Sequence, residues 1–208
     1  MMARGWPVML EDGRVGLRPL RVRDAATWSE VRIRNERWLS PWEGRPESQP
    51  TATWADRHSP VVFTAMLRNV RKESRAGRTL PLAVTYDGRL AGQVTASNVI
   101  RGAFDSASVG YWVDAAVAGR GVLPTALAML VDHCFGAVGL HRIEANIRPE
   151  NVASRRVVEK LGFREEAMHL RYLFIDGAWR DHLSFAVTRE DVPDGMLRRW
   201  HAVRPAPP

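Results

Sequence analysis

Two glycines and an arginine stand at Gly119–Gly121, between an alternating apolar stretch and an apolar helical pattern. Glycine lets a backbone come close to a ligand because it has no Cβ, and the first turn of a helix exposes unpaired N–H groups. A helix N-terminus also carries about half a positive charge, so this turn could hold a phosphate. It lacks the third glycine of a dinucleotide fingerprint and the Gly-Lys-Ser/Thr of a nucleotide P-loop. Taken alone, such a sequence fits an ordinary structural turn between a strand and a helix equally well.

A second candidate lies downstream, in the sequence HRIEANIRPENVASRRVVEKLGF. HRIEANI alternates like a strand, and Asn151 has the position of an N-cap for the helix that follows. Ser154 lies in the first turn of that helix. Gly162 and Phe163 match a helix C-terminus closed by a left-handed glycine and a packing apolar residue. Strand, turn and helix therefore follow one another twice in this half of the chain.

The remaining reactive residue types give no further site. The six histidines are scattered and show no HExxH or other metal-ligand spacing, so we expect no bound metal. Cys134 is the single cysteine, and it shares an apolar helical face with Leu127 and Leu130, which is typical of a core residue. One cysteine excludes an internal disulfide framework and fits a reducing cytoplasm.

The elements that must position these residues can be predicted from hydrophobic periodicity and turn residues. Asp24 has the position of an N-cap before the first helix, and Asp87-Gly88 and Asp176-Gly177 are typical hairpin turns. Residues 35–60 show no clear period. The expected strands are 15–19, 79–86, 89–100, 107–113, 141–147 and two within 167–188, and the expected helices are 25–34, 61–77, 123–138 and 152–161.

The order of these elements indicates the fold class. Hairpins come first and strand–helix units follow, which predicts an α+β fold with a mixed, mostly antiparallel sheet and helices on its faces. A parallel doubly wound sheet is disfavoured because the hairpin turns are explicit. At 208 residues the chain has the size of one domain, residues 1–208, with a core over 15–188. Residues 189–208 are expected to form a C-terminal helix and a frayed proline-rich tail.

The formal net charge is +7, and arginine supplies the excess because Lys72 and Lys160 are the only lysines. Such an excess suits a polyanionic ligand or a ribonucleoprotein neighbourhood, but it could equally be a solvated surface. The arginines are dispersed and lack interleaved aromatic residues, so direct nucleic-acid binding is not expected. No apolar run approaches the roughly 18 residues of a membrane span, and no signal-peptide pattern opens the sequence.

The glycine turn followed by Asn151-x-x-Ser154 resembles the GCN5-related N-acetyltransferases, the GNAT superfamily, and the resemblance runs from Leu17 to Val187. The stretches LRPLRVRDAATW, NERWLSPWE and DGAWRDHLSFAV look most similar to the RimJ/RimL group, which acetylates the N-terminal amines of proteins, notably ribosomal proteins. The resemblance implies a GNAT fold with a splayed strand pair. It also implies acetyl-CoA as co-substrate and direct acetyl transfer in a ternary complex.

The same resemblance assigns residues to the cofactor. The strand at Tyr111–Val113 would splay from its neighbour and offer backbone hydrogen bonds to the pantetheine arm, and the next turn would wrap the pyrophosphate. Asn151 would bond the pantetheine region, and Ser154 would point toward the sulfur. Ala118 and Leu123 depart from the family pattern, which would weaken binding. The implied cofactor-binding set is Trp112, Val113, Ala118, Gly119, Arg120, Gly121, Val122, Leu123, Asn151 and Ser154.

Acetyl transfer to an amine needs a proton acceptor and a proton donor. An α-amino group has an unperturbed pKa of about 7.7–8.0, so roughly a tenth is neutral near pH 7 and a modest base suffices. Glu144 is the first candidate base, although strand alternation could equally aim it at solvent, and His141 is the second. Ser154 and Tyr111 are candidate acids for the leaving thiolate. Their alternatives are a helix-cap serine and an ordinary sheet aromatic.

Asn35, Arg37, Trp38 and Trp42 are candidate acceptor-site residues, because tryptophans in an irregular segment often line a binding surface. The alternative is that the tryptophans anchor a long loop to the core. The expected acceptor is the N-terminal segment of a protein, such as a ribosomal protein, and the enzyme would be a cytoplasmic monomer or homodimer.

Two other functions stay open. An acetyltransferase for small amines, such as aminoglycosides or polyamines, is the second choice, although the arginines near the presumed acceptor site disfavour a cationic acceptor. A non-catalytic CoA-binding or ribosome-associated regulator would carry the same motifs.

Overall fold

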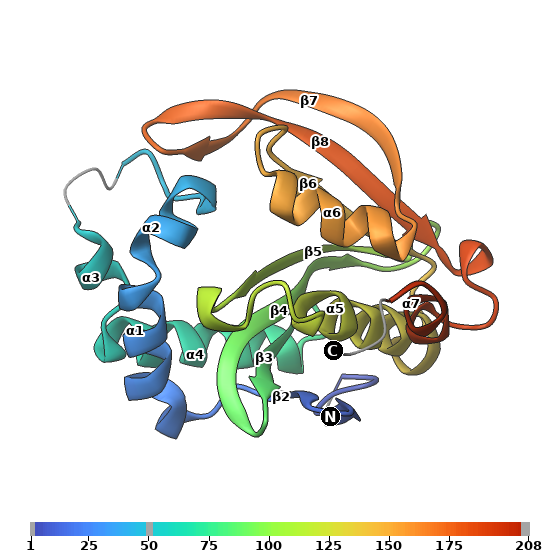
Figure 1. The fold of residues 1–208 in the computed structure, drawn as a ribbon, viewed down its shortest axis with the longest axis horizontal. Coiled ribbons are helices and arrows are strands. Elements are labelled where there is room, and N and C mark those ends of the chain that lie inside the picture. The colour runs from blue at the N-terminus through green and yellow to red at the C-terminus, as the bar shows by residue number, and fades with distance from the viewer. Residues whose placement is uncertain (1–2, 49–51, 205–208) are drawn as a thin grey trace.

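The fold is organised around one mixed β-sheet (Figure 1). A computed structural model describes residues 3–48 and 52–204. Its strands follow the order β1-β2-β3-β4-β5-β6-β8-β7, in which β5 and β6 pair in parallel and the other neighbours pair antiparallel. This sheet confirms the expected fold class. The strands are β1 (Leu10–Asp12), β2 (Val15–Pro19), β3 (Leu80–Tyr86), β4 (Arg89–Ile100), β5 (Ser106–Val113), β6 (Arg142–Ile147), β7 (Arg164–Ile175) and β8 (Ala178–Thr188).

Helices cover both faces of the sheet. In β3, Ala83 packs in a cluster with Trp28 and Phe63, whereas its neighbours Leu82 and Val84 pack in a larger cluster with helix α5. Successive side chains of a strand point to opposite faces, so α1 and α4 lie on one face and α5, α6 and α7 on the other. The helices are α1 (Ala25–Arg34), α2 (Glu36–Leu39), α3 (Trp54–Arg57), α4 (Pro60–Arg75), α5 (Val122–His133), α6 (Val152–Leu161) and α7 (Met196–Val203).

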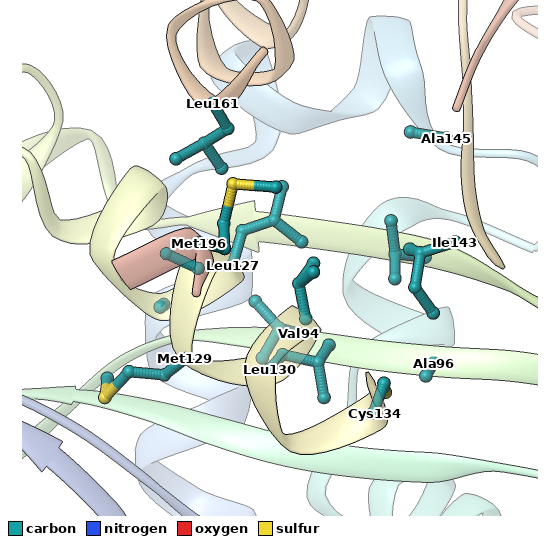
Figure 2. Packing of buried hydrophobic residues seen from close by; sticks show 14 of the residues in the cluster. Val94, Ala96, Leu127, Met129, Leu130, Cys134, Ile143, Ala145, Leu161 and Met196 are labelled. Carbon is teal, nitrogen blue, oxygen red and sulfur yellow. The ribbon is translucent and has the colours of Figure 1, made fainter. Parts of the chain in front are cut away.

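The larger core lies between α5 and the sheet (Figure 2). Leu127, Leu130 and Cys134 are fully buried there, as the helical spacing predicts. Each fully buried leucine contributes about 1.5–3 kcal/mol relative to an exposed one. Burial also raises the pKa of the Cys134 thiol to about 12, so the thiol stays protonated at neutral pH.

Strands β5 and β6 separate after a short parallel pairing. Ser106, Ala107 and Ser108 pair with Arg142, Ile143 and Glu144, and no later residue of β5 has a partner in β6. On its other side, β5 stays paired with β4 up to Val113. Asp114 N–H donates to Ala91 O at 2.7 Å, so by alternation the backbone groups of Trp112 face β4 and those of Tyr111 and Val113 face away. The second half of β5 therefore presents free backbone groups to the gap beside β6.

Helix α7 packs against α5 through two polar contacts. The Asp132 carboxylate accepts hydrogen bonds from the N–H groups of Met196 (2.6 Å) and Leu197 (2.9 Å), which begin α7. The buried Trp200 then donates its indole N–H to Thr125 Oγ1 at 2.8 Å. Because a carboxylate satisfies the free N–H groups of a helix start and favours its dipole, Asp132 fixes the start of α7 against the last turn of α5. Trp200 then fixes the second half of α7 against the first turn of α5.

Some elements differ from the sequence prediction. The segment expected to be irregular contains the short helices α2 and α3 and a 3₁₀ turn, Ser40–Trp42. Asp24 precedes α1 as expected, but its side chain accepts from Arg21 N (2.7 Å) and from Arg18, not from the helix. The expected helix over 123–138 is α-helical only to His133 and continues as a π-helical segment, Cys134–Val138. Strand β1 was not predicted.

The C-terminal helix forms as expected, but residues 205–208 of the predicted tail lie outside the described residues. Within residues 3–48 and 52–204, no helix has the length and apolar character needed to cross a membrane.

Removing the Asp132 carboxylate tests its role at the start of α7. We expect Asp132→Ala to destabilise the protein by about 1–2 kcal/mol, because two N–H groups lose their acceptor. For a chain of this size that corresponds to a melting temperature lower by roughly 2–8 °C. Asp194→Ala is the control, since Asp194 is exposed and its nearest cation, Arg198, is 3.8 Å away. Equal melting temperatures for the two variants would contradict the role of Asp132.

Candidate active site

A cleft of about 850 Å³ lies where β5 and β6 separate. Trp112 of β5 pairs with Gln93 of β4, so both side chains lie on the α1/α4 face, whereas Tyr111 lies on the α5/α6 face. Because residues of both faces line one cleft, it passes through the sheet. Its lining is Arg32, Arg37, Trp38, Leu39, Pro41, Trp42, Glu43, Gly44, Gln93, Thr95, Ser97, Gly110, Tyr111, Trp112, Val113, Val117, Ala118, Gly119, Gly121, Val122, Leu123, Pro124, Glu150, Asn151, Val152, Ala153, Ser154, Arg156, Val157 and Lys160.

The glycine turn forms one end of the cleft on the α5/α6 face. Gly119 and Gly121 have φ of +78° and +75°, a region that glycine enters without the strain of a Cβ. The first intrahelical bond of α5 runs from Thr125 N–H to Gly121 O at 3.1 Å. The N–H groups of Val122 and Leu123 precede that bond and so have no intrahelical acceptor. This helix start is therefore suited to a phosphate group.

Helix α6 adds two cations to the same part of the cleft. Arg156 and Lys160 are one helical turn apart, line the cleft and are exposed. Neither has an ion pair among the residues that the structure describes. Sequence reasoning missed both, although their spacing with Ala153 and Val157 is that of one helical face.

Asn151 and Ser154 are brought to Tyr111 across the cleft. The Asn151 side chain caps α6 by accepting from Ser154 N–H at 3.0 Å, as predicted. Ser154 Oγ donates to Tyr111 Oη at 2.9 Å, and Tyr111 Oη lies 3.4 Å from the Ser154 carbonyl oxygen. Burial raises the pKa of Tyr111, although the bond from Ser154 opposes this shift. The phenol therefore keeps its proton at neutral pH and can donate it.

Trp38 and Trp42 line the opposite end of the cleft. Trp38 donates its indole N–H to Val113 O at 3.1 Å, which ties α2 to the free edge of β5. The Arg148 guanidinium lies 5.5 Å from the centre of the Trp42 ring and donates to Pro41 O at 2.8 Å. Trp38 and Trp42 remain 40% and 36% exposed, so they have free surface for a ligand as well as contacts with the scaffold.

A buried charge cluster supports this wall. Glu43 forms ion pairs with Arg32 and with Arg57 (3.1 Å). Arg32 is 4% exposed and lies 4.9 Å from the ring centres of both Trp54 and Trp112. Burial, together with the nearby Arg57 cation, lowers the pKa of Arg32 to about 9. The guanidinium remains charged at neutral pH and holds Glu43 at the edge of the cleft.

His58 completes the cluster in its neutral form. Its Nδ1 lies 2.8 Å from Trp54 O, so Nδ1 carries the proton, and Nε2 accepts from Arg32 Nη2 at 2.8 Å. Burial lowers the pKa of His58 to about 4, and the Arg32 cation contributes in the same direction. Nε2 also lies 3.0 Å from Glu43 Oε1. A proton on Nε2 would exchange the bond with Arg32 for one to Glu43 and add a third cation to the cluster.

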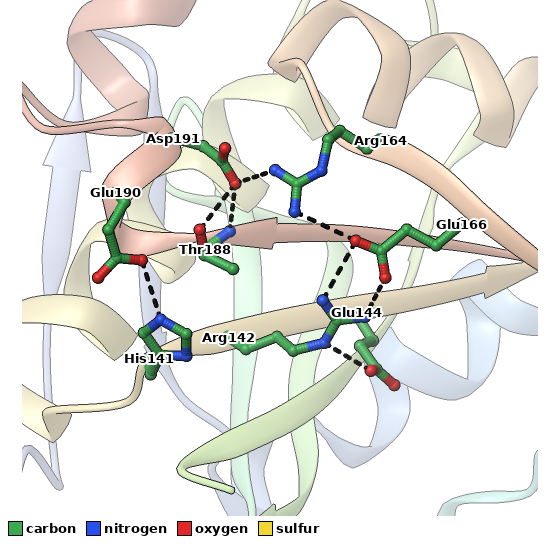
Figure 3. A network of polar contacts seen from close by, with 8 residues as sticks. All are labelled: His141, Arg142, Glu144, Arg164, Glu166, Thr188, Glu190 and Asp191. Carbon is green, nitrogen blue, oxygen red and sulfur yellow. Dashed lines mark hydrogen bonds and ion pairs between the residues drawn. The ribbon is translucent and has the colours of Figure 1, made fainter.

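The candidate bases Glu144 and His141 are not among the residues that line the cleft. Figure 3 shows them among polar contacts of β6 and its neighbours. Glu144 accepts from Arg142 Nε at 2.8 Å, and the other side of that guanidinium binds Glu166. His141 bonds to Glu190 at 2.9 Å near the surface. Both side chains thus belong to a network of ion pairs along β6 and its neighbours.

Asn35 and Arg120 also lie outside the lining. Asn35 is buried and donates to Asp114 Oδ1 at 2.8 Å, while its Oδ1 accepts from Ala115 N–H at 3.0 Å. It therefore joins the end of α1 to the segment after β5, as a structural tie. Arg120 is exposed. Its cation helps to lower the pKa of Asp87 in the β3–β4 turn, after the larger effect of the hydrogen bond from Arg14.

Other residues that line the cleft match no sequence motif, so the sequence alone did not point to them. Gln93 and Thr95 are one strand period apart on β4, and Gln93 Nε2 donates to Thr95 Oγ1 at 3.1 Å. Their side chains join Gly110 on the face toward Trp38. Glu43 ends the stretch NERWLSPWE, which pointed to the segment but not to this side chain.

A family model described as "Acetyltransferase (GNAT) domain" matches residues 14–164. The chain belongs to the GNAT acetyltransferase family. It is similar to the solved structure of Mycobacterium smegmatis RimJ in complex with CoA-disulfide, with 46% identity, 97% of each chain covered and a TM-score of 0.92. It is 31% identical over 191 residues to the ribosomal protein uS5 alanine N-acetyltransferase of Escherichia coli, which covers 90% of this chain and 94% of that protein. A match with "Probable N-acetyltransferase YjcK" of Bacillus subtilis has 41% identity over 105 residues, 50% of this chain and 58% of that protein.

As a GNAT member, the protein is an acetyl-CoA-dependent N-acetyltransferase. The residues present fit that co-substrate. The cleft combines an unpaired strand edge for amide groups, a helix start with two glycines for a phosphate, and two cations on α6. Ala118 and Leu123 both line it. Acetyl-CoA supplies an activated thioester carbonyl. Within the described residues, no group of three or more His, Cys, Asp or Glu side chains could hold a metal ion.

The neutral state of His58 makes stability depend on pH. Because its pKa is about 4 in the fold and about 6.5 when unfolded, the unfolded chain binds more protons between these values. The stability that neutral His58 contributes to the fold is complete above about pH 6.5 and is lost as pH falls toward 4. We expect the urea midpoint to fall over this range, and His58→Gln to start lower but fall less steeply. Parallel curves for parent and variant would contradict a neutral buried His58.

Proposed function

We propose that this enzyme transfers acetyl from acetyl-CoA to the N-terminal α-amine of a ribosomal protein, by direct attack in a ternary complex in the cytoplasm. The through-sheet cleft carries the proposal, because it separates a phosphate-binding end from an end walled by Trp38 and Trp42. Two substrates could then meet where β5 and β6 part. The Escherichia coli relative, a ribosomal protein uS5 alanine N-acetyltransferase, supports the choice of acceptor.

The acceptor end favours a peptide over a compact amine. An extended segment could pass between the indoles of Trp38 and Trp42 and the polar side chains of Gln93 and Thr95. Gly110 has no side chain on that face, which leaves room for a main chain close to β5. Peptides that bind in this way use main-chain hydrogen bonds, so they need few specific side chains.

The enzyme does not need a strong base for an α-amine. Such an amine is roughly one-tenth neutral near pH 7, whereas a lysine amine is almost fully charged. Glu144 and His141 do not line the cleft, so we propose that water takes the amine proton and that the cleft holds the neutral amine. This assignment also favours an N-terminal acceptor over a lysine side chain.

We assign proton donation to Tyr111, with Ser154 as its partner. Tyr111 Oη keeps its proton because burial raises the pKa of Tyr111. Its outgoing hydrogen bond, to Ser154 O, is long at 3.4 Å, so the proton is free to turn toward a leaving sulfur. Ser154 Oγ donates to Tyr111 Oη at 2.9 Å and stabilises the phenolate that results.

Substitutions at this pair separate catalysis from binding. We expect Tyr111→Phe to lower kcat about 100-fold, which is the lower part of the range for general acid catalysis. Ser154→Ala should lower kcat less, and the double variant should be no worse than Tyr111→Phe, because the two residues act as a unit. The dissociation constant of acetyl-CoA should change little. A matched loss of acetyl-CoA affinity would show instead that the pair only holds the cofactor.

A panel of acceptors tests the function itself. Short peptides with different first residues would be compared with their Nα-blocked forms, spermidine and an aminoglycoside, by release of free thiol. We expect turnover of the unblocked peptides, with alanine or serine preferred first. Equal rates on spermidine and an alanine peptide would favour the small-amine alternative. Binding of acetyl-CoA with no turnover of any acceptor would favour a CoA-binding regulator.

A further inference from the structure

The acceptor end of the cleft has more positive than negative charge. The charged side chains that line it there are Arg32, Arg37, Glu43 and Glu150. Glu150 is paired at 3.3 Å with Arg148, which contacts Pro41 and Trp42. The Glu43 carboxylate is already paired with Arg32 and with Arg57 behind it. His58 is neutral, so it does not change the net charge at this end of the cleft. Both carboxylates are therefore already paired with arginines, and the charge of Arg37 is not compensated in the cleft.

The titration of the neighbouring groups agrees with this balance. Burial and then the Arg57 cation lower the pKa of Arg32. Burial and then the Arg45 cation lower the pKa of Arg57, although Glu36 opposes this. Burial is the larger cause of both shifts, and in each case a neighbouring cation acts in the same direction. An incoming anion would lower the electrostatic free energy here, and an incoming polycation would raise it.

Arg37 is the member of this group that is available to a ligand. It lies on α2, directly before Trp38, and it is exposed. No hydrogen bond or ion pair of its side chain occurs among the described residues. It lines the cleft together with Trp38, Pro41 and Trp42, which form the wall that an extended acceptor would follow.

We propose that the acceptor is an acidic N-terminal segment and that Arg37 binds a carboxylate of that segment a few residues after the acetylated amine. This inference rests on the proposed function, since it needs a peptide acceptor. The arginine side chain presents a planar fork of N–H donors that matches a carboxylate, so the contact would select Asp or Glu over Gln and Lys. An extended chain advances about 3.3 Å per residue, so one position of the segment should lie within reach of Arg37.

A charge scan of the acceptor tests this assignment. Ten-residue peptides that begin with alanine would carry Glu, Gln or Lys at one of positions two to six and neutral residues elsewhere. KM would be measured for the parent enzyme, Arg37→Gln and Arg37→Glu. The control is Arg68→Glu, which makes the same change of charge at an exposed arginine of α4 outside the cleft lining.

At one position we expect Glu to give a KM about tenfold lower than Gln in the parent enzyme, which corresponds to about 1.4 kcal/mol. Arg37→Gln should abolish this difference, and Arg37→Glu should prefer Lys at the same position. Arg68→Glu should keep the parent preference. Equal KM values for Glu and Gln at every position, with the peptides still acetylated, would overturn the acidic acceptor alone. A preference that survives Arg37→Glu would overturn the role of Arg37. Failure to acetylate any peptide would overturn the proposed function as well.

Discussion

The cleft depends on a single constraint, which is that β5 and β6 pair at only three positions and then separate. Each strand keeps its other neighbour, so the sheet is held on both sides of the gap while its centre opens. The backbone groups of Tyr111 and the N–H group of Val113 remain free along this gap, while the Val113 carbonyl accepts from Trp38. Because the opening passes through the sheet, helices of one face supply the proposed cofactor end and helices of the other supply the proposed acceptor end.

Polar contacts hold the scaffold on both sides of the gap. The start of α5 rests on Trp200, which Asp132 positions through α7. On the other face, the cluster of Arg32, Glu43 and His58 fixes the wall that carries the tryptophans. Contacts from Trp38 to Val113 and from Arg148 to Pro41 join this wall to the sheet. Two clusters that are distant in sequence thus set the width of one cleft.

Local sequence patterns predicted the fold class, most strands, and the helix start and helix cap at the proposed cofactor end, because each depends on a short motif. The helix start at Gly121 and the Asn151 cap are of this kind, since the residues that define them are neighbours in the chain. The acceptor end could not be predicted in the same way. Glu43 and His58 meet only after the chain folds, and the direction of Glu144 depends on an arginine two residues away. A strand period gives the face of a residue but not its partner.

Hydrogen exchange of β5 tests the central claim most directly. The amides of Tyr111 and Val113 face the gap, so acetyl-CoA should slow their exchange, together with that of Val122 and Leu123 at the start of α5. An acceptor peptide added with CoA should slow amide exchange at Trp38 and its neighbours on α2. The slower exchange along β5 and at the start of α5 should remain. If acetyl-CoA raises the melting temperature, and so binds, but leaves exchange along β5 unchanged, it does not occupy the gap between β5 and β6. That result would contradict the central claim.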